Sequence, residues 1–234
     1  KGNVGEVELP PQFGEQLHTD LIARAVLAVQ SSRRQPYGTD PEAGKRYSAK
    51  LSRRRRNYKG AYGHGISRVP RKTMSRSGTR FNWQGALAPG TVGGRQAHPP
   101  KAEKLFGRKI NKKENRKAIR SALAATMMAS VVSQRGHAIP KNYPFVAASG
   151  LEQLSKTKAV VNALDKFGLA AELMRVAKRT VRAGKGKARG RRYKGKVGPL
   201  LVVSTENCGL VMAARNIMGV DVAVVNRLNA DMLA

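Results

Sequence analysis

Two internal segments hold all of the chain's excess positive charge. Residues 33–117 contain 24 Lys and Arg against 4 Asp and Glu, and residues 175–196 contain 11 against none. The other 127 residues contain 10 of each sign. Cations at this density repel one another and cannot be buried unpaired, so neither segment can belong to a hydrophobic core. We therefore expect a neutral domain that carries two basic loops, and a polyanion as its partner.

The neutral part has the hydrophobic spacing of a globular α/β domain. Asn111 and Glu114 suggest a capping box, and Gly136 and Gly168 are expected helix stops. Short apolar runs at 200–204 and 220–225 predict buried strands. Alternation of such strands with helices predicts a mainly parallel sheet with helices on both faces. The predicted helices span 14–32, 111–136, 152–167 and 210–218, with a last one from about Asn226.

Residues 36–104 read as a long, extended, non-globular loop inside this domain. The segment contains 6 of the chain's 11 prolines and few branched aliphatic residues. Ordering such a loop costs roughly 1–2 kcal/mol per residue in backbone entropy, which its own apolar atoms cannot offset. We expect a phosphate backbone to order it. The predicted organisation is a globular domain of residues 1–35 and 105–234, the loop 36–104, and a second basic loop at 182–196 within the globular domain.

The composition of the long loop favours RNA over DNA. Half of the chain's 12 aromatic residues lie here, interleaved with arginines and lysines, and such rings can stack on unpaired bases while cations hold phosphates. The alternatives are a small hydrophobic cluster for the aromatic residues and a localisation signal for the four-arginine run. The candidate RNA-binding residues are Arg53, Arg54, Arg55, Arg56, Tyr58, Lys59, Tyr62, His64, Arg68, Arg80, Trp83, Arg95, His98, Lys101 and Lys104.

The second basic segment, 182–196, contains glycines at 184, 186 and 190 that resemble a dinucleotide-binding loop. We reject that interpretation because more cations and then a strand follow, where a fingerprint loop must open a helix. A flexible loop lying along phosphates is favoured over a merely solvated basic loop. Its candidate RNA-binding residues are Lys185, Lys187, Arg189, Arg191, Arg192 and Lys194.

The sequence offers no catalytic, metal or cofactor site. The four histidines lack ligand spacing, the acids form no acid/base pair, and the single cysteine, Cys208, has no clear partner. One cysteine excludes a disulfide scaffold and fits a reducing interior. No run approaches the ~18 apolar residues of a membrane span. Residues 1–10 lack the apolar core of a signal peptide. We expect a cytoplasmic protein that contacts no membrane.

Three ordered motifs resemble the archaeal and eukaryotic branch of large-subunit ribosomal protein L-four. They are VGGRQAHPPKAEK at 92–104, IRSALAAT at 119–126 and RAGKGKARGRRYK at 182–194. The resemblance covers nearly the whole chain. It implies a globular α/β domain on the outer face of the large subunit and a long loop threaded into ribosomal RNA. It also implies a first strand upstream of residue 1 and further residues after Ala234.

The resemblance further implies protein partners. The loop tip is expected near the wall of the nascent-peptide exit tunnel, beside the loop of ribosomal protein L-twenty-two and in reach of the nascent peptide. The globular domain is expected to contact ribosomal protein L-eighteen of the eukaryotic type. By position, the tip residues should be Arg71, Lys72, Met74 and Arg76.

We conclude from the sequence that the chain is a structural RNA-binding protein of the large ribosomal subunit and not an enzyme. The alternative is an RNA-modifying enzyme with a nucleotide-binding α/β domain and a basic RNA arm, which binding of S-adenosylmethionine or a nucleotide would reveal. A third possibility is a free regulatory RNA-binding protein. Co-sedimentation with large subunits at high salt would separate that protein from an integral ribosomal component.

Overall fold

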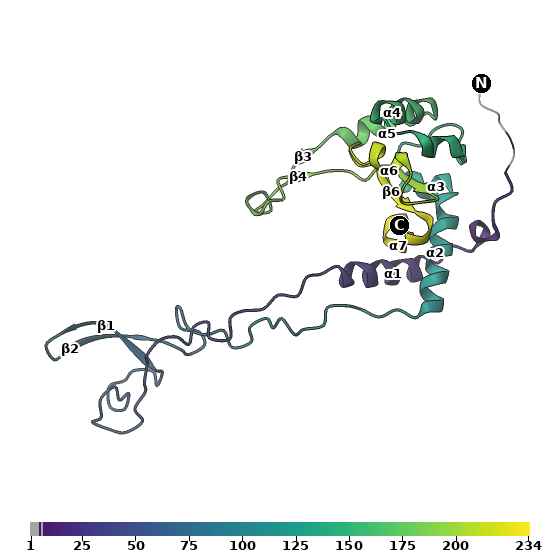
Figure 1. Ribbon diagram of the computed structural model, residues 1–234. Helices are drawn as coiled ribbons and strands as arrows, with labels where there is room; N and C mark the ends of the chain where they lie inside the picture. The colour runs from purple at the N-terminus through teal and green to yellow at the C-terminus, as the bar shows by residue number, and fades with distance from the viewer. Residues whose placement is uncertain (1–4, 6) are drawn as a thin grey trace. The chain divides into compact units, whose positions relative to one another are not determined.

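The computed structural model describes residue 5 and residues 7–234, and their contacts divide the chain into two compact units (Figure 1). The first unit combines the residues up to Arg33 with residues 107–234, and the second comprises residues 34–106. The expectation that residues 1–4 and 6 belong to the globular domain lies outside the described residues.

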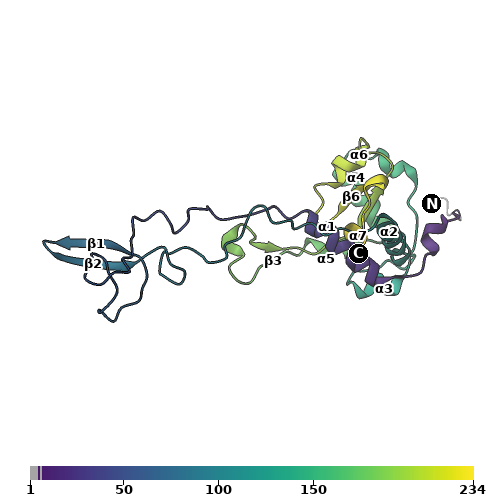
Figure 2. The same ribbon diagram turned by 90° about the horizontal axis from the view of Figure 1, so that it is seen from below.

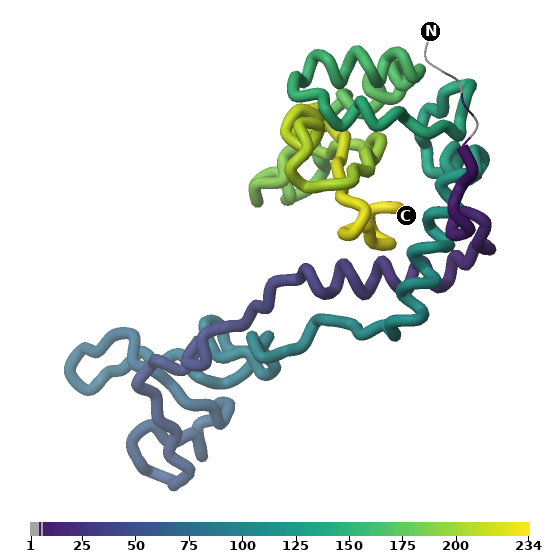
Figure 3. The backbone as a smooth tube through the Cα atoms, turned by 45° about the vertical axis from the view of Figure 1, so that its right-hand side comes forward, coloured from purple at the N-terminus to yellow at the C-terminus, as the bar shows by residue number. Residues whose placement is uncertain are grey.

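Three helices of the first unit pack together through alanines. They are α1 (Thr19–Ser32), α2 (Lys112–Thr126) and α7 (Ala230–Leu233). Each contributes one alanine with no solvent exposure, namely Ala25, Ala118 and Ala230. Figure 3 shows the C-terminal turn of the chain beside α1 and α2. Methyl groups at all three contacts let the helix backbones approach closely, so this core is small and tightly packed.

Ser121 ties the N-terminal segment to α2. The side chain is fully buried, and its hydroxyl accepts a hydrogen bond from the His18 N–H (2.7 Å) and donates one to the Gln16 carbonyl (2.9 Å). Both backbone groups precede α1, where no helical partner is available to them. One buried hydroxyl thus satisfies two backbone groups and fixes the entry of the chain into α1.

A second core surrounds the parallel strands β5 (Leu200–Val203) and β6 (Asp221–Val224). Val203 of β5 packs with residues of α4 (Thr157–Lys166) and α6 (Gly209–Ala214). The chain enters β5 beside Gly219, whose carbonyl accepts from the Gly198 N–H at 2.8 Å. Gly219 has a φ of +68°, and a Cβ there would lie 1.9 Å from Val176 Cγ1, so only glycine fits.

The remaining elements are short. They are the 3-10 helices Pro11–Gly14, Ser149–Gln153, Lys187–Arg189 and Val225–Arg227, the helices α3 (Ala129–Gln134) and α5 (Ala170–Ala177), and the strands β1 (Arg71–Ser77), β2 (Arg80–Gly85), β3 (Thr180–Val181) and β4 (Tyr193–Lys194).

A mixed α/β domain is confirmed, but a mainly parallel sheet is not. β5 and β6 are parallel, as the two apolar runs predict, yet they form a sheet of only two strands. The pairs β1–β2 and β3–β4 are antiparallel hairpins. Among the described residues no further strand joins β5 or β6. The apolar run 144–149 forms no strand; it opens with Pro144, which has no N–H to donate to a ladder.

The long helix expected over 111–136 is wrong in two respects. Asn111 occupies the N-cap, but its side chain caps nothing, and the Glu114 carboxylate instead pairs with Arg24 of α1 (3.3 Å). The helix then ends at Thr126. In a continuing helix the Thr126 carbonyl would accept a hydrogen bond from a backbone N–H one turn later, but here it accepts one from the Tyr143 hydroxyl. Tertiary contacts, which helical spacing cannot reveal, override both expectations.

The glycine stops are confirmed. Gly136 and Gly168 have φ values of +95° and +81° and follow α3 and α4. After α3, the Gly136 N–H donates to Ser133 (2.8 Å) and the His137 N–H to Val132 (3.4 Å), which is a Schellman motif.

Four other predicted helices have different bounds. The expected helix 14–32 begins only at Thr19, and 152–167 divides into a 3-10 helix and α4. The expected helix 210–218 is the shorter α6, which ends at Ala214. The last helix starts at Ala230, where the Asn229 side chain accepts from the Met232 N–H. No helix in the described part of the chain is long and apolar enough to cross a membrane.

We predict that Ser121→Ala lowers the free energy of unfolding of the first unit by about 1–3 kcal/mol, because the His18 N–H and Gln16 carbonyl lose their buried partner. Chemical unfolding followed by circular dichroism measures the change. Ser130→Ala, at an exposed serine of α3, is the matched control and should change stability by less than about 0.5 kcal/mol. Equal effects of the two substitutions would contradict the assigned role.

Candidate nucleic-acid interface

The second unit is built around the hairpin β1–β2 (Figure 2). Its two-residue turn has a positive φ only at Gly78 (+56°), the pattern of a type II′ turn, which suits the twist of paired strands. Thr73 and Ser75 pair with consecutive residues of β2, so Met74 is the extra residue of a β-bulge. The Met74 side chain is 57% exposed.

The second unit has almost no core. Only Gly60, Ala61 and Ala86 are buried among residues 34–106, a range that contains 17 Lys and Arg against 3 Asp and Glu. Such a segment is held by local contacts and carries a large unbalanced charge. Its surface is therefore suited to a polyanion.

The predicted RNA-binding cations are accessible. In the second unit Arg53–Arg56, Arg68, Arg80, Lys101 and Lys104 are exposed, whereas Lys59 and Arg95 are half-buried. Tyr62, His64 and His98 are exposed as well. Within the described residues, none of the predicted RNA-binding cations forms an ion pair with a carboxylate. Their charge therefore remains available to an external anion.

The predicted tip residues are spread along the hairpin. Arg71 pairs with Gly85 at the end remote from the turn, and its guanidinium donates to the Ser67 and Val69 carbonyls (2.6 and 3.3 Å). Arg76 lies next to the turn and donates to the Gly78 carbonyl at 3.0 Å. The Lys72 ammonium lies 3.7 Å from the ring centre of Tyr47.

The aromatic side chains divide into two groups. Tyr58, Phe81 and Trp83 pack on one another, with centroid separations of 5.8–5.9 Å. This is the arrangement of the hydrophobic-cluster alternative, although Tyr58 remains 59% exposed. Tyr62 instead lies under the guanidinium of Arg68, at 5.5 Å.

Two extended stretches of the second unit, which contain residues 38–44 and 95–102, run side by side (Figure 3). The Thr39 N–H donates to the Pro100 carbonyl at 3.1 Å. A Cβ on Gly38 would lie 2.6 Å from the Ala102 nitrogen, and one on Gly44 would lie 2.4 Å from the Arg95 nitrogen. Glycine is therefore required at both positions for the segments to approach this closely.

The second basic loop is a small hairpin arm. β3 and β4 pair antiparallel, and the Arg182 N–H donates to the Arg192 carbonyl at 2.8 Å. Gly184 and Gly186 are followed by the three-residue 3-10 helix Lys187–Arg189, then by Gly190 and β4, and not by the longer helix that a dinucleotide-binding loop opens. The predicted residues of the arm are all exposed, namely Lys185, Lys187, Arg189, Arg191, Arg192 and Lys194.

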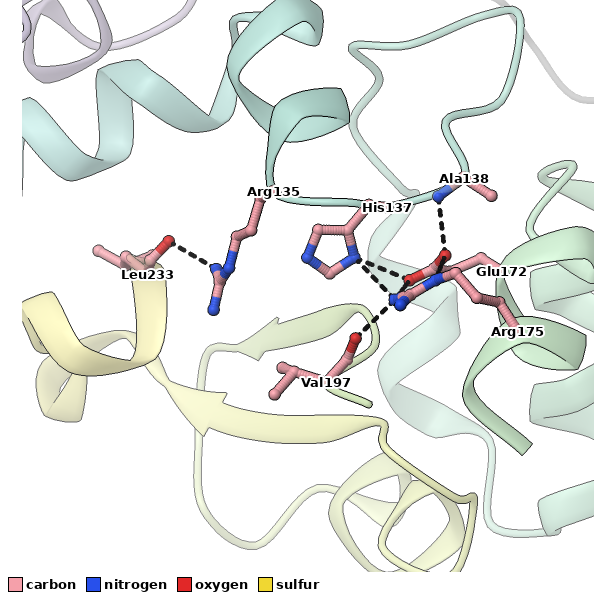
Figure 4. Close-up of polar contacts among 7 residues, drawn as sticks. All are labelled: Arg135, His137, Ala138, Glu172, Arg175, Val197 and Leu233. Carbon is pink, nitrogen blue, oxygen red and sulfur yellow. Dashed lines mark hydrogen bonds and ion pairs between the residues drawn. The ribbon is translucent and has the colours of Figure 1, made fainter. Parts of the chain in front are cut away.

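A buried ion pair fixes the root of this arm (Figure 4). Glu172 of α5 is 2% exposed and accepts from Arg175 Nε (2.7 Å), the Ala138 N–H (2.9 Å) and His137 Nδ1 (2.7 Å). The Arg175 guanidinium also donates to the Val197 carbonyl (2.6 Å), just after β4. One carboxylate thereby joins α5, the turn after α3 and the end of the arm.

The groups around Glu172 lower the pKa of its carboxyl. Burial on its own would raise the pKa of this carboxyl, but hydrogen bonds from Arg175, Ala138 and His137 outweigh that effect. Together they lower the pKa from 4.5 to about 2.

Sequence reasoning missed this cluster. Glu172 and Arg175 lie three residues apart on α5, which is a spacing for a helical ion pair. That spacing was the available signal, but it does not distinguish a buried pair from a surface one. His137 lies 35 residues from Glu172 and gave no signal at all.

No group of three or more metal-ligating side chains occurs in residues 5 and 7–234.

Comparison with known proteins gives a consistent picture. The model of the ribosomal protein L4/L1 family matches residues 7–234. Large ribosomal subunit protein uL4 of Nanoarchaeum equitans is 52% identical over 231 residues, which is 99% of this chain and 86% of the relative. Its counterparts in Archaeoglobus fulgidus and Methanococcoides burtonii are each 45% identical, over 100% and 98% of this chain and 87% and 85% of their own lengths.

We predict that the Glu172 cluster makes stability fall in acid. Because the folded-state pKa is lowered, the contribution is complete above pH ~5 and is lost as the pH falls towards 2, by about 3 kcal/mol in all. Glu172→Gln should therefore be less stable than the parent at pH 7, with a difference that shrinks in acid. Unfolding free energies measured between pH 7 and 2 test this.

The control for this experiment is Glu206→Gln, at an exposed carboxylate paired with Arg227 (2.8 Å). It should cost less than about 1 kcal/mol. A Glu172→Gln difference that stays constant from pH 7 to 2 would contradict the prediction.

Proposed function

Because the chain belongs to the ribosomal protein L4/L1 family and is a structural constituent of the large ribosomal subunit in the cytoplasm, we propose that its two basic loops are its ribosomal RNA-binding surfaces. As a ribosomal component it associates with ribosomal RNA and other ribosomal proteins, and it is not an enzyme. Membership of this family excludes the alternative of an RNA-modifying enzyme.

The observation that carries the proposal concerns the predicted RNA-binding cations of loops 36–104 and 182–196. Most of them are exposed, and none pairs with a carboxylate of the described residues. A chain that used these groups for its own stability would pair them with carboxylates. Left unpaired, they are suited to neutralising phosphates, which releases condensed counterions and favours binding. The RNA-binding residues of this proposal are those identified from the sequence in the two loops.

Binding coupled to ordering is the proposed mechanism for the long loop. With three buried residues between 34 and 106, the loop gains little from its own contacts, so phosphates and bases supply the interactions that fix it.

We also propose that the hairpin β1–β2 is the part of the loop that approaches the exit tunnel, beside a protein of the L-twenty-two family and the nascent peptide. Arg71, Lys72, Met74 and Arg76 all lie on β1. Met74 at the β-bulge and Arg76 near the turn support this role best, because both side chains are exposed. A protein of the eukaryotic-type L-eighteen family is the proposed neighbour of the globular domain.

The salt dependence of RNA affinity tests the role of the four-arginine run. We expect replacement of Arg53–Arg56 by alanine to weaken binding to a large-subunit rRNA transcript and to flatten the log–log salt slope by about 0.7–0.9 per lost phosphate contact. Filter binding across a salt series measures it.

The matched control removes the same charge from the globular unit. Lys141, Lys156, Lys158 and Lys166 are exposed there and lie outside both basic loops, so their replacement by alanine should leave the slope nearly unchanged. Equal slopes for both quadruple variants would remove Arg53–Arg56 from the RNA contacts.

Limited chymotrypsin digestion tests the coupled ordering. In the free protein, loop 36–104 should be cleaved quickly at its aromatic residues while a core of about 105–234 plus 1–35 persists, because the loop has almost no buried side chains. In assembled large subunits the same sites should be protected. Equal protection of loop and core in the free protein would contradict the mechanism.

A further inference from the structure

The second unit contains a hollow next to Tyr37, and the binding of phosphates by exposed cations gives this hollow no role. Its volume is about 800 Å³, within the ~300–1,000 Å³ range of small-ligand sites. It is lined by Tyr37, Ala97, His98, Pro99, Pro100, Lys101, Glu103 and Lys104.

The walls of this hollow are held at a fixed spacing. The hydrogen bond from the Thr39 N–H to the Pro100 carbonyl and the close approach of Gly38 to Ala102 join its two sides. Pro99 and Pro100 restrict the backbone of one side, since each proline ring fixes φ. These contacts bring the two sides of the hollow together, and the prolines limit the conformations of one side.

Tyr37 supplies a flat apolar surface. Its ring stacks on Phe106 with centroids 5.6 Å apart and an interplanar angle of 18°, and the Arg34 guanidinium lies 4.5 Å from the Phe106 ring centre. Tyr37 nevertheless remains 57% exposed. One ring face is packed, and the rest of the ring is open to an aromatic ligand.

Cations stand beside this ring. Lys101 and Lys104 are exposed and form no ion pair with any carboxylate of the described residues, and His98 adds a ring that can donate a hydrogen bond. The Glu103 carboxylate also lines the hollow and repels anions, so a phosphate must lie towards the lysines. The Lys104 ammonium also lies 5.8 Å from the ring centre of Phe106, the ring on which Tyr37 stacks. An exposed aromatic ring beside two ammonium groups that pair with no carboxylate of the described residues has the chemistry that binds one nucleotide of a single strand.

We propose that this hollow binds one unpaired nucleotide of RNA, with its base stacked on Tyr37 and its phosphate held by Lys101 and Lys104. The inference rests on the proposed function and names a single position within it. It assigns this stacking position to Tyr37, which is not among the RNA-binding residues proposed from the sequence.

Affinity for a large-subunit rRNA transcript, measured across a salt series with the full chain, tests the assignment. Tyr37→Leu should weaken binding about 5- to 100-fold, the effect of losing one base–aromatic stack, while the salt slope stays unchanged. Tyr37→Phe should bind like the parent. Lys101→Ala combined with Lys104→Ala should lower the slope by about 1.4, the value for two phosphates of a single strand.

The matched control is Tyr47→Leu, because the face of that ring already carries the Lys72 ammonium. It should weaken binding less than about 3-fold. In assembled large subunits, ultraviolet cross-linking followed by mass spectrometry should also recover a nucleotide adduct on a peptide containing Tyr37.

Each outcome decides the question. The inference would be overturned if Tyr37→Leu bound the transcript as tightly as the parent, or if Tyr37→Phe lost as much affinity as Tyr37→Leu. In either case, salt-dependent binding by the parent would still support the proposed function. A parent protein that binds the transcript without salt dependence would overturn the proposed function first and the inference with it. Circular dichroism of each variant shows whether the first unit remains folded.

Discussion

Unpaired cations cannot be buried, and the layout of the chain follows from that constraint. The first unit has a mainly apolar interior, with alanines between α1, α2 and α7 and a core of leucines and valines around β5 and β6. Its deepest charged group, Glu172, is neutralised by Arg175. The remaining cations are concentrated on segments with almost no interior. The first unit is therefore stabilised by its own contacts, whereas the long loop has only three buried residues to hold it.

Sequence patterns predicted the parts of the fold that depend on local physics. The stops at Gly136 and Gly168 need a residue that tolerates positive φ, and the runs that became β5 and β6 need burial on both sides. The patterns failed where a distant residue took over a local group. Arg24 draws Glu114 away from the cap, and Tyr143 occupies the Thr126 carbonyl. Neither partner can be identified from spacing along the chain.

For the candidate interface, too, some features could be predicted from the sequence and others could not. Charge counting drew attention to residues 33–117, and the prolines and scarce branched aliphatic residues predicted a loop at 36–104; the second unit of the structure spans 34–106. Charge counting also drew attention to the arm that carries Lys185 and Arg192. Composition could not say which rings pack on one another, because Tyr58 and Trp83 are 25 residues apart in sequence and meet only through the β1–β2 hairpin. The Glu172 cluster depends on a turn after α3 and gave no compositional sign.

The bond between Arg175 and the Val197 carbonyl has a kinetic consequence. A basic tail with one free end sweeps a large volume and meets phosphates in many orientations. The arm between β3 and β4 is fixed at both ends, by the fold at its start and by the Arg175 guanidinium at its return. Its cations therefore stay within a small volume, which raises their effective concentration once the globular unit has docked. After docking of the globular unit, contact between the arm and a neighbouring phosphate would be an intramolecular step.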